Sequence, residues 1–494
     1  MLTFNSDFKK SFLFALGLGL AYIAPVVFSV GYYLDDLGRS LWGYTLWGGN
    51  ARPLADLVMT VLNFGKPLQD ISPIPQILAI AALAFTIAAA CARFLPGRPF
   101  LGALAFSPLI ISPFFLENLS YKYDALPMAL AVACATLPFT YNIDRLPLRF
   151  LTMGGSLLMA LCLYQPAINI YVCFAILSFL FFVYRQERRE AFIFLGLSIS
   201  GLLIAYAIYA IVIVPLTLDG VYSQAHATIV SGSFAHISSI VARNFGWAGT
   251  LVWKLYDGAF LYIVLPFMAA YLFLNYRLAF RRTEGSIYLD LGVFIILLLS
   301  PAALLLSIAG PTLLLESPIF DPRVLVGHSA VLATFFVATL WLIPKKLDGL
   351  KYAIVVPLVF AFIFDYTYAN AMAAQNRFER MIVTSMVEDI VSDDMRGAQY
   401  LTFYGTMPTA PETQLAEHKF PLIGNLNQIP FRGNWYWGYV KMKHFGIQLE
   451  HDHLTEEEVV STACSAEHEK QGLFHTLYRN GENLIISFQP IACD

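Results

Sequence analysis

Two adjacent carboxylates stand at the start of the first polar segment of the chain. Asp35 and Asp36 directly follow a long apolar run, and Arg39 comes about one helical turn after Asp35. Partial burial and mutual repulsion would favour the protonated form of one of the two carboxyl groups. That suits a general base that must deprotonate a hydroxyl, such as that of a sugar. The structural alternative is that the pair caps the next helix or lies at a solvated helix end.

A second polar island, residues 117–124, lies between two apolar runs. Lys122 could hold a phosphate group while Asp124 positions it, or the two side chains could pair with each other in a polar hairpin. Glu117 and Tyr121 add hydrogen-bonding groups to the same island. This segment is therefore a second candidate for substrate binding.

Three further polar residues interrupt apolar surroundings. Arg52 follows Trp47 in a loop whose aromatic side chains could stack on sugar rings or form a belt at the membrane interface. Gln165 lies at a break between two apolar runs, where it could satisfy freed backbone groups or face a cavity. Arg323 precedes a later run and could snorkel to lipid headgroups or clamp a phosphate with two hydrogen bonds.

The histidines do not form a metal-binding pattern. His226 and His236 lack metal-ligand spacing, and His451 and His453 flank Asp452 without a third ligand at a suitable distance along the chain. Motifs of nucleotide-binding proteins, serine hydrolases and zinc proteases are absent from the sequence. The sequence therefore predicts no metal site.

The composition indicates that these groups are positioned by a membrane protein. Of 494 residues, 58% are hydrophobic and only 13% are charged, about half the roughly 25% of a soluble domain. A single soluble core cannot absorb that much apolar surface, which excludes a soluble or disordered chain. The balance of 31 basic against 34 acidic residues excludes a basic nucleic-acid binder.

Apolar runs long enough to cross about 30 Å of hydrocarbon predict eleven transmembrane helices. The predicted spans are residues 11–30, 73–95, 100–116, 125–141, 150–164, 167–184, 191–215, 259–276, 287–309, 328–343 and 352–369. With a cytoplasmic N-terminus, the short inside segments carry 15 Lys and Arg residues, Arg282 among them, whereas the longer outside loops carry seven. This asymmetry predicts that orientation, and the odd number of spans places the tail outside.

The predicted outside loops carry all the candidate residues described so far. These loops are residues 31–72, 117–124, 216–258 and 310–327, with Gln165 at the break between two spans. The sequence thus predicts a transmembrane domain over 1–369 and a separate domain over 370–494. All the candidate residues are expected at one face of the membrane.

The tail after residue 370 is predicted to be a small α+β domain. A helix is expected over 378–390 and a strand over 399–404. Thr455 should cap a helix whose first turn is acidic. Asn480 and Gly481 mark a hairpin between two apolar strands.

Two of the six cysteines lie in this tail. The other four lie in predicted spans, where burial of the thiol is the ordinary outcome. Cys464 and Cys493 would face an oxidising periplasm, which permits a disulfide between them. We therefore expect this pair to form a disulfide.

Taken together, carboxylates, cations and aromatic rings at membrane depth match a substrate with a lipid tail, a phosphate and a sugar. Several of the segments resemble the type II Gtr glucosyltransferases, serotype-converting enzymes of bacteria and phages that decorate O-antigen. The residues that carry the resemblance are Tyr32–Arg39, Gly43-Tyr44, Ala51–Leu54 and Asn118–Met128, with Tyr164-Gln165 and Pro322-Arg323 as weaker markers. The family usually has glycine where this chain has Ala51.

The resemblance implies a GT-C type membrane glycosyltransferase, an α-helical polytopic hexosyltransferase of the bacterial inner membrane. The implied donor is undecaprenyl-phosphate glucose, and the implied acceptor is a sugar of the lipopolysaccharide O-antigen. A donor synthase and a flippase of the same gene cassette would supply the donor. No nucleic-acid partner is expected.

The corresponding mechanism is a single inverting displacement, in which an acceptor hydroxyl attacks the anomeric carbon and polyprenyl phosphate leaves. The base would be Asp35 or Asp36. The candidates for stabilising the departing phosphate are the cations Arg39, Lys122, Arg323 and, in second rank, Arg52. The candidates for positioning the substrate are Glu117, Tyr121, Asp124 and Gln165. Two carboxylates and a phosphate suffice to hold Mg²⁺, but the cations already supply positive charge, so no cofactor is expected.

Three other functions fit the same features, one of which is a non-catalytic partner in polysaccharide assembly, for which Asp35 and Asp36 would be dispensable. A transporter or flippase of lipid-linked sugars would have a similar number of spans, although it would not need a folded tail. A GT-C enzyme that transfers another sugar would use the same loops.

Overall fold

The computed structural model describes residues 5–141, 143–281 and 287–493. Arg282, assigned from the sequence to a cytoplasmic segment, lies outside the described residues. The chain forms two compact units. The first consists of Met1–Val27 with Thr45–Tyr366, and the second of Phe28–Tyr44 with Thr367–Asp494.

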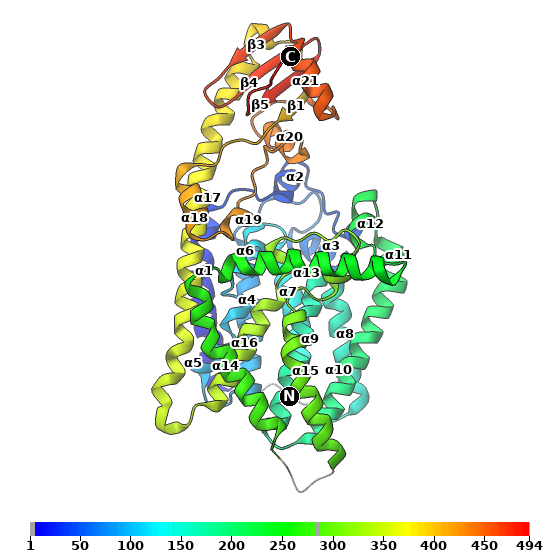
Figure 1. Cartoon of the computed structure of the whole chain (residues 1–494), viewed down its shortest axis with the longest axis vertical. Helices are drawn as coiled ribbons and strands as arrows, with labels where there is room; N and C mark the ends of the chain where they lie inside the picture. Colours follow the sequence, from blue (N-terminus) through cyan, green and yellow to red (C-terminus); the bar gives the residue numbers. More distant parts are fainter. Residues whose placement is uncertain (1–4, 142, 282–286, 494) are drawn as a thin grey trace. The chain divides into compact units, whose positions relative to one another are not determined.

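The first unit is a bundle of helices (Figure 1). Its α-helices are α1 (Ser6–Ser29), α3 (Pro53–Leu62), α4 (Ile74–Phe94), α5 (Pro99–Phe106), α6 (Pro113–Ser120), α7 (Ala125–Thr136), α8 (Leu146–Leu163), α9 (Ile168–Tyr184), α10 (Arg188–Ile208), α11 (Val214–Thr217), α12 (Val221–Ala227), α13 (Phe234–Tyr256), α14 (Ala259–Ala279), α15 (Ile287–Leu306), α16 (Gly327–Leu342) and the start of α17 (Val355–Ile390). Its short helical turns are η1 (Gly48–Asn50), η2 (Ser107–Leu109), η3 (Leu137–Phe139), η4 (Gln165–Ala167), η6 (Gly310–Leu314), η7 (Pro322–Val324) and η8 (Lys345–Ile354), and η5 (Tyr209–Ile213) is a π-helix.

Among the described residues, eight helices are long and apolar enough to cross a membrane, or nine if the bent pair Pro99–Leu109 and Pro113–Ser120 is one span. Two more of the predicted spans form the shorter apolar helices Ala125–Phe139 and Gly327–Leu342. At 1.5 Å per residue these reach only about 22–24 Å, less than the roughly 30 Å of hydrocarbon. The prediction of a polytopic helical membrane protein is confirmed, whereas length and composition do not establish eleven spans.

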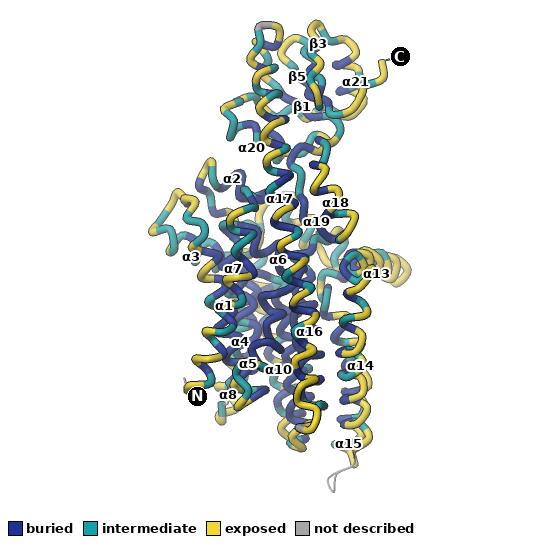
Figure 2. Tube along the Cα trace, turned by 90° about the vertical axis from the view of Figure 1, so that its left-hand side faces the viewer, coloured by how far each residue is buried: buried dark blue, intermediate teal, exposed yellow. Residues whose placement is uncertain are grey.

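The core of the first unit surrounds α9 and α16, which are buried at almost every position. Both sequences are apolar on all sides, as expected of helices enclosed by other helices. By contrast, α14 and α15 expose much of their surface (Figure 2). The split predicted at Tyr164 is confirmed, because α8 ends before this residue and α9 begins soon after it.

The second unit is built on one five-stranded sheet. Its strands are β1 (Tyr400–Tyr404), β2 (Glu450–His451), β3 (His468–Gln471), β4 (Thr476–Asn480) and β5 (Asn483–Ser487), in the spatial order β2-β1-β5-β4-β3. β1 is parallel to both of its neighbours, and β4 is antiparallel to both β3 and β5. Its other helical elements are α2 (Asp35–Trp42), α18 (Pro411–Lys419), α19 (Ile423–Leu426), α20 (Tyr436–Lys443), α21 (Glu456–Cys464), the turn η9 (Asp393–Met395) and the end of α17.

The alternation of apolar residues in β5 divides the core of this unit between two faces. Leu484 and Ile486 pack in a cluster with Met386 near the end of α17. Ile485 points to the other face and packs against Val459 of α21. The predicted strands, the hairpin and the small α+β domain are confirmed.

The boundary between the last predicted span and the tail is not a break in the chain. Residues 352–369 and the helix predicted over 378–390 both lie largely in α17, which runs without interruption from Val355 to Ile390. Composition changes along this helix, but nothing in its sequence ends it, because neither proline nor glycine follows its first turn.

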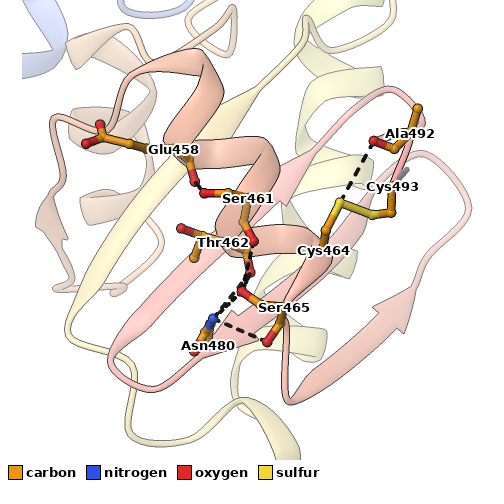
Figure 3. The surroundings of a disulfide bond; sticks show 8 residues. All are labelled: Glu458, Ser461, Thr462, Cys464, Ser465, Asn480, Ala492 and Cys493. Atoms are coloured by element: carbon orange, nitrogen blue, oxygen red, sulfur yellow. Dashed lines mark hydrogen bonds between the residues drawn. A yellow bond between two sulfur atoms is a disulfide. The ribbon is translucent and has the colours of Figure 1, made fainter.

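The C-terminal part of the tail contains a disulfide and a capped helix. Cys464 and Cys493, the pair expected from the sequence, are bonded, with their Cα atoms 5.4 Å apart (Figure 3). Thr455 caps α21 by accepting a hydrogen bond from the backbone N–H of Glu458, whose carboxylate in turn accepts one from the N–H of Thr455. The acidic first turn predicted a helix start here because carboxylates favour a helix N-terminus.

Candidate active site

A buried ion pair joins the polar island of α6 to the turn η7. Glu117 is fully buried, and its two carboxylate oxygens accept hydrogen bonds from the backbone N–H of Arg323 at 2.8 Å and from its guanidinium at 3.2 Å. One residue thus binds both the main chain and the side chain of the other. Because a buried carboxylate is costly without such partners, the pairing fixes where Arg323 lies.

The guanidinium of Arg323 has two further partners. It donates a hydrogen bond to the Tyr121 hydroxyl and lies 2.9 Å from a carboxylate oxygen of Asp321. The Arg323 carbonyl oxygen accepts a hydrogen bond from the Tyr164 hydroxyl at 2.6 Å. Arg323 is therefore compensated by two carboxylates and held at both its side chain and its main chain.

Arg52 has a different set of partners. Its Nε donates a hydrogen bond to Gln165 Oε1 at 2.9 Å, and its guanidinium lies 4.9 Å from the centre of the Tyr164 ring. Both partners are neutral, and among the described residues no carboxylate lies within 4 Å of this guanidinium. The side chain is also partly exposed. Arg52 is therefore an oriented positive charge with room for an anion.

Gln165 is oriented by hydrogen bonds to the last residue of η1 and the first residue of η5. Its amide donates hydrogen bonds to the Asn50 carbonyl at 2.9 Å and to the Tyr209 hydroxyl at 2.8 Å. The Tyr209 hydroxyl donates in turn to the Ala51 carbonyl at 3.0 Å. Tyr209 begins the π-helix η5, and such bulges often occur at functional sites. Gln165 therefore holds the Arg52 guanidinium and also satisfies a backbone carbonyl of the Arg52 loop.

The backbone of Ala51 is left-handed, which is the conformation that a glycine at this position of the expected motif would favour. Ala51 has φ 58°, a conformation that favours glycine, and it is buried beside Arg52. The glycine that the resemblance leads one to expect here would adopt this turn without strain. In this chain the turn is retained with alanine.

Lys122 and Asp124 lie in a neighbouring group of contacts. Lys122 pairs with Asp70 at 3.4 Å. Asp124 accepts a 2.6 Å hydrogen bond from the indole N–H of Trp47, whose backbone N–H is bound by Asp56. Asp124 thus helps to hold an aromatic ring of the Arg52 loop.

The adjacent carboxylates occupy α2, in the second unit, and their surroundings differ. Asp36 is fully buried and accepts a hydrogen bond from the backbone N–H of Tyr33 at 3.3 Å. The side chain of Asp35 is 45% exposed and lies 3.7 Å from the guanidinium of Arg39. Arg39 is itself buried, and its guanidinium lies 5.8 Å from the centre of the Tyr44 ring. Asp35 is thus the carboxylate that a substrate can reach.

The position of α2 is fixed by contacts within the second unit. His444 Nε2–H donates to the Leu37 carbonyl at 3.0 Å, and the Tyr33 hydroxyl donates to the Leu426 carbonyl at 2.9 Å. Burial lowers the pKa of His444; the bond to Leu37 acts in the opposite direction, and Lys441 adds to the lowering. His444 therefore stays a neutral donor at pH 7. Leu34, which precedes the helix, has φ 43°, so these contacts hold a strained turn.

Comparison with known proteins supplies the chemistry. The profile of the glucosyl transferase GtrII family matches residues 24–334, more than half of the chain.

The chain belongs to the GtrII glucosyl transferase family.

A protein of Salmonella phage P22, described as an uncharacterized 55.3 kDa protein in the gtrB 5′ region, is 29% identical over 448 residues. The matched segment covers 89% of this chain and 91% of that protein. No solved structure matches the chain significantly.

As a GtrII glucosyl transferase, the chain is a glycosyltransferase, and the resemblance seen in the sequence is confirmed. The matched range contains every candidate site residue except the disulfide cysteines. Within the first unit, the structure joins Glu117, Tyr121 and Arg323, and it joins Arg52 to Gln165.

Sequence reasoning missed several supporting residues of this GtrII transferase. Asp321 carried a usable signal, since it stands two positions before Arg323 in a short polar turn. Asp70, Tyr209 and His444 carried none, because each meets its partner only through the tertiary fold.

Proposed function

We propose that this GtrII glucosyl transferase moves a glucosyl residue from undecaprenyl-phosphate glucose to a sugar of the lipopolysaccharide O-antigen. The reaction takes place at the periplasmic face of the bacterial inner membrane, with the N-terminus in the cytoplasm and the tail in the periplasm. Membership of the GtrII glucosyl transferase family supports glucose as the transferred sugar. The excess of Lys and Arg in the short segments on one side supports the orientation.

The observation that carries this proposal is the uncompensated charge of Arg52. A leaving polyprenyl phosphate develops negative charge, and an oriented guanidinium without a carboxylate partner can stabilise it with two parallel hydrogen bonds. Arg323 cannot do so equally well, because Glu117 and Asp321 already engage it. We therefore give Arg52 the first rank for the phosphate and make Arg323 a positioning residue.

The base in this proposal is Asp35. It is the more exposed of the two carboxylates, so an acceptor hydroxyl can approach it, whereas Asp36 is buried and bound to the turn before α2. Asp35 would take the proton of the attacking hydroxyl as the bond from the anomeric carbon to the phosphate oxygen breaks. One base suffices because the displacement is single, in contrast to the two carboxylates of a retaining glycosidase.

The test uses the full chain in lipid nanodiscs, a synthetic polyprenyl-phosphate glucose and purified O-antigen. Arg52→Lys and Arg52→Gln should lower kcat by about 10²–10³-fold, the usual effect of removing one donor to a developing anion. Arg432→Gln is a matched control, because Arg432 also stacks on an aromatic ring, 3.9 Å from the centre of Trp435, and has no carboxylate within 4 Å among the described residues.

The control should keep wild-type activity. Equal activity of all three variants would remove Arg52 from the mechanism. Translocation of the lipid-linked sugar without its transfer to the acceptor would instead reveal a flippase. A preference for a donor with another sugar, seen also by mass spectrometry of O-antigen from cells with and without the gene, would overturn the assignment of glucose.

A further inference from the structure

Helix α13 has an orientation unlike that of the helices around it. It lies crosswise to α14 and α15 (Figure 1), and Figure 2 shows it end-on beside the end of α14. It is separated from the start of α14, a candidate span, only by Asp257 and Gly258. If α14 spans the membrane, a helix placed across its end would lie in the plane of the membrane surface. The sequence had predicted only an outside loop over 216–258.

One side of α13 is fixed to the rest of the first unit. Asn244, Ala248, Leu251 and Leu255 are buried, and their spacing of three and four residues places them on one face. The Asn244 amide donates hydrogen bonds to the backbone carbonyls of Leu313 in η6, at 3.1 Å, and of Leu315 just after it, at 2.8 Å. This face therefore packs against the rest of the first unit, and the amide of its one polar side chain is hydrogen-bonded there.

A second side of the helix is apolar and exposed. The exposed Phe234 and Phe245 and the half-buried Val252 follow at intervals of eleven and seven residues, which returns each to nearly the same side of a helix with 3.6 residues per turn. Phe234 is 86% exposed, and Phe245 is 59% exposed. Trp253, between this side and the next, is 54% exposed. A helix facing water would carry polar residues here.

A third side, opposite the exposed phenylalanines, carries the charges. His236, Arg243 and Lys254 are separated by seven and eleven residues and so share one side, and the helix contains no carboxylate. Arg243 donates a hydrogen bond to the Glu316 carbonyl at 2.6 Å, and His236 lies 3.1 Å from the Glu316 carboxylate. These contacts connect the helix to the segment before Arg323.

We propose that α13 is an interfacial helix that lies in the bilayer surface. Its apolar side, with Phe234, Phe245 and Val252, enters the acyl-chain boundary, and its basic side faces the headgroups and water. Aromatic residues next to lipid and cations next to headgroups are the distribution typical of such helices. The crosswise position at the end of a span favours a lipid surface over a protein partner. The inference does not depend on the proposed function.

Spin labels on the two exposed sides test the proposal. Phe245→Cys places a nitroxide on the apolar side. Thr250→Cys places one on the basic side, because Thr250 follows Arg243 by seven residues. The full chain is reconstituted in vesicles of phosphatidylethanolamine and phosphatidylglycerol, with the labelled parent chain as background. Oxygen concentrates in the acyl region and a water-soluble nickel complex does not. The label at 245 should therefore collide several-fold more often with oxygen than with nickel, and the label at 250 should do the reverse.

Three outcomes would overturn the proposal. Both labels could collide mainly with nickel, as on a helix in water. Both could collide mainly with oxygen, as on a helix immersed in lipid. The label at 245 could be shielded from both reagents, as beneath a protein partner.

A second measurement avoids labelling. Bromine atoms on the lipid acyl chains quench nearby tryptophans, and Trp253→Phe should reduce the total quenching more than Trp435→Phe in the tail. An equal reduction by the two variants would also contradict a lipid-facing α13. Only variants that elute from a size-exclusion column at the same volume as the parent chain are compared.

Discussion

The two arginine–carboxylate pairs of the polar segments differ in almost every respect. Glu117 and Arg323 meet through two hydrogen bonds of 2.8 and 3.2 Å around a fully buried carboxylate. Asp35 and Arg39 lie 3.7 Å apart, and there the carboxylate is the exposed partner and the arginine the buried one. Burial makes the first pair a fixed structural joint, whereas exposure leaves the carboxylate of the second free to exchange partners. Asp35 and Arg39 are four positions apart in the sequence, whereas 206 positions separate Glu117 from Arg323.

The sharpest test of this contrast is the activity of Asp35→Asn. Loss of the proposed base should lower kcat by about 10²–10⁴-fold, while the free energy of unfolding changes by less than about 1 kcal/mol because the Asp35 side chain is 45% exposed. Transfer rates and thermal unfolding of the purified chain measure the two effects. Asp36→Asn keeps an acceptor oxygen for the Tyr33 N–H, so its activity should fall less. The opposite order would make Asp36 the base, and normal O-antigen modification in cells by both variants would exclude both residues.

Glu117→Ala should show the reverse pattern, with a large loss of stability. Removing one member of a buried pair costs about 3–5 kcal/mol, and the lower end is expected here because the Arg323 side chain is 20% exposed. Thermal unfolding in detergent would measure it, with Asp35→Ala as the matched exposed control. Equal destabilisation by the two variants would abolish the distinction between the pairs.

A third acid–base contact lies in the tail and adds a pH test. His475 Nε2 lies 2.9 Å from Asp389, which also pairs with Lys470 at 3.0 Å. Burial lowers the pKa of His475 despite the opposing effect of Asp389. The folded tail therefore holds the His475 ring in its neutral form. Below about pH 6.5 the unfolded chain takes up a proton at this ring more readily than the folded chain does. The free energy of unfolding should therefore be highest above about pH 6.5 and fall at lower pH by at most about 1.4 kcal/mol per pH unit. Hydrogen exchange of β4 at pH 7.0 and 5.5 should show this loss, and His475→Gln should reduce it. If the loss of stability between pH 7.0 and 5.5 were unchanged in His475→Gln, groups other than His475 would cause it.

The smallest expected effect concerns the turn that holds Arg52. Ala51→Gly removes the cost of a left-handed alanine, about 1–2 kcal/mol, but adds backbone freedom to the unfolded chain, about 0.4–1 kcal/mol. A net stabilisation of about 0.5–1 kcal/mol with unchanged kcat is expected in thermal unfolding and transfer assays. Ala55→Gly, at a buried position in the first turn of α3, is the control and should destabilise. A loss of activity in Ala51→Gly would show that the alanine itself positions Arg52.

Much of the architecture could be predicted because it depends on local patterns. Apolar runs located α4, α8 and α9 to within a few residues, and Thr455 with Glu458 marked the start of α21. What failed depends on tertiary context. The long α13 was expected only as a loop, since its small and aromatic residues have no simple two-sided pattern.

The candidate site was predictable by residue type but not by role. Arg52 was ranked below Arg323 because a sequence shows which cations exist and not which carboxylates compensate them. For Lys122 and Asp124, two positions apart, the sequence could not show the contact of Lys122 with Asp70 or that of Asp124 with Trp47. Pairings between distant segments decide which charge remains available to a substrate.

In the proposed orientation, the bond between Cys464 and Cys493 would give each molecule a chemical record of the export of its tail. Three of the four remaining thiols, Cys91, Cys162 and Cys173, are buried, and Cys134 is partly so. A tail retained in a reducing compartment would react with two equivalents of maleimide that an exported tail would not. A gel shift on whole cells would therefore count, chain by chain, how many tails have left the cytoplasm.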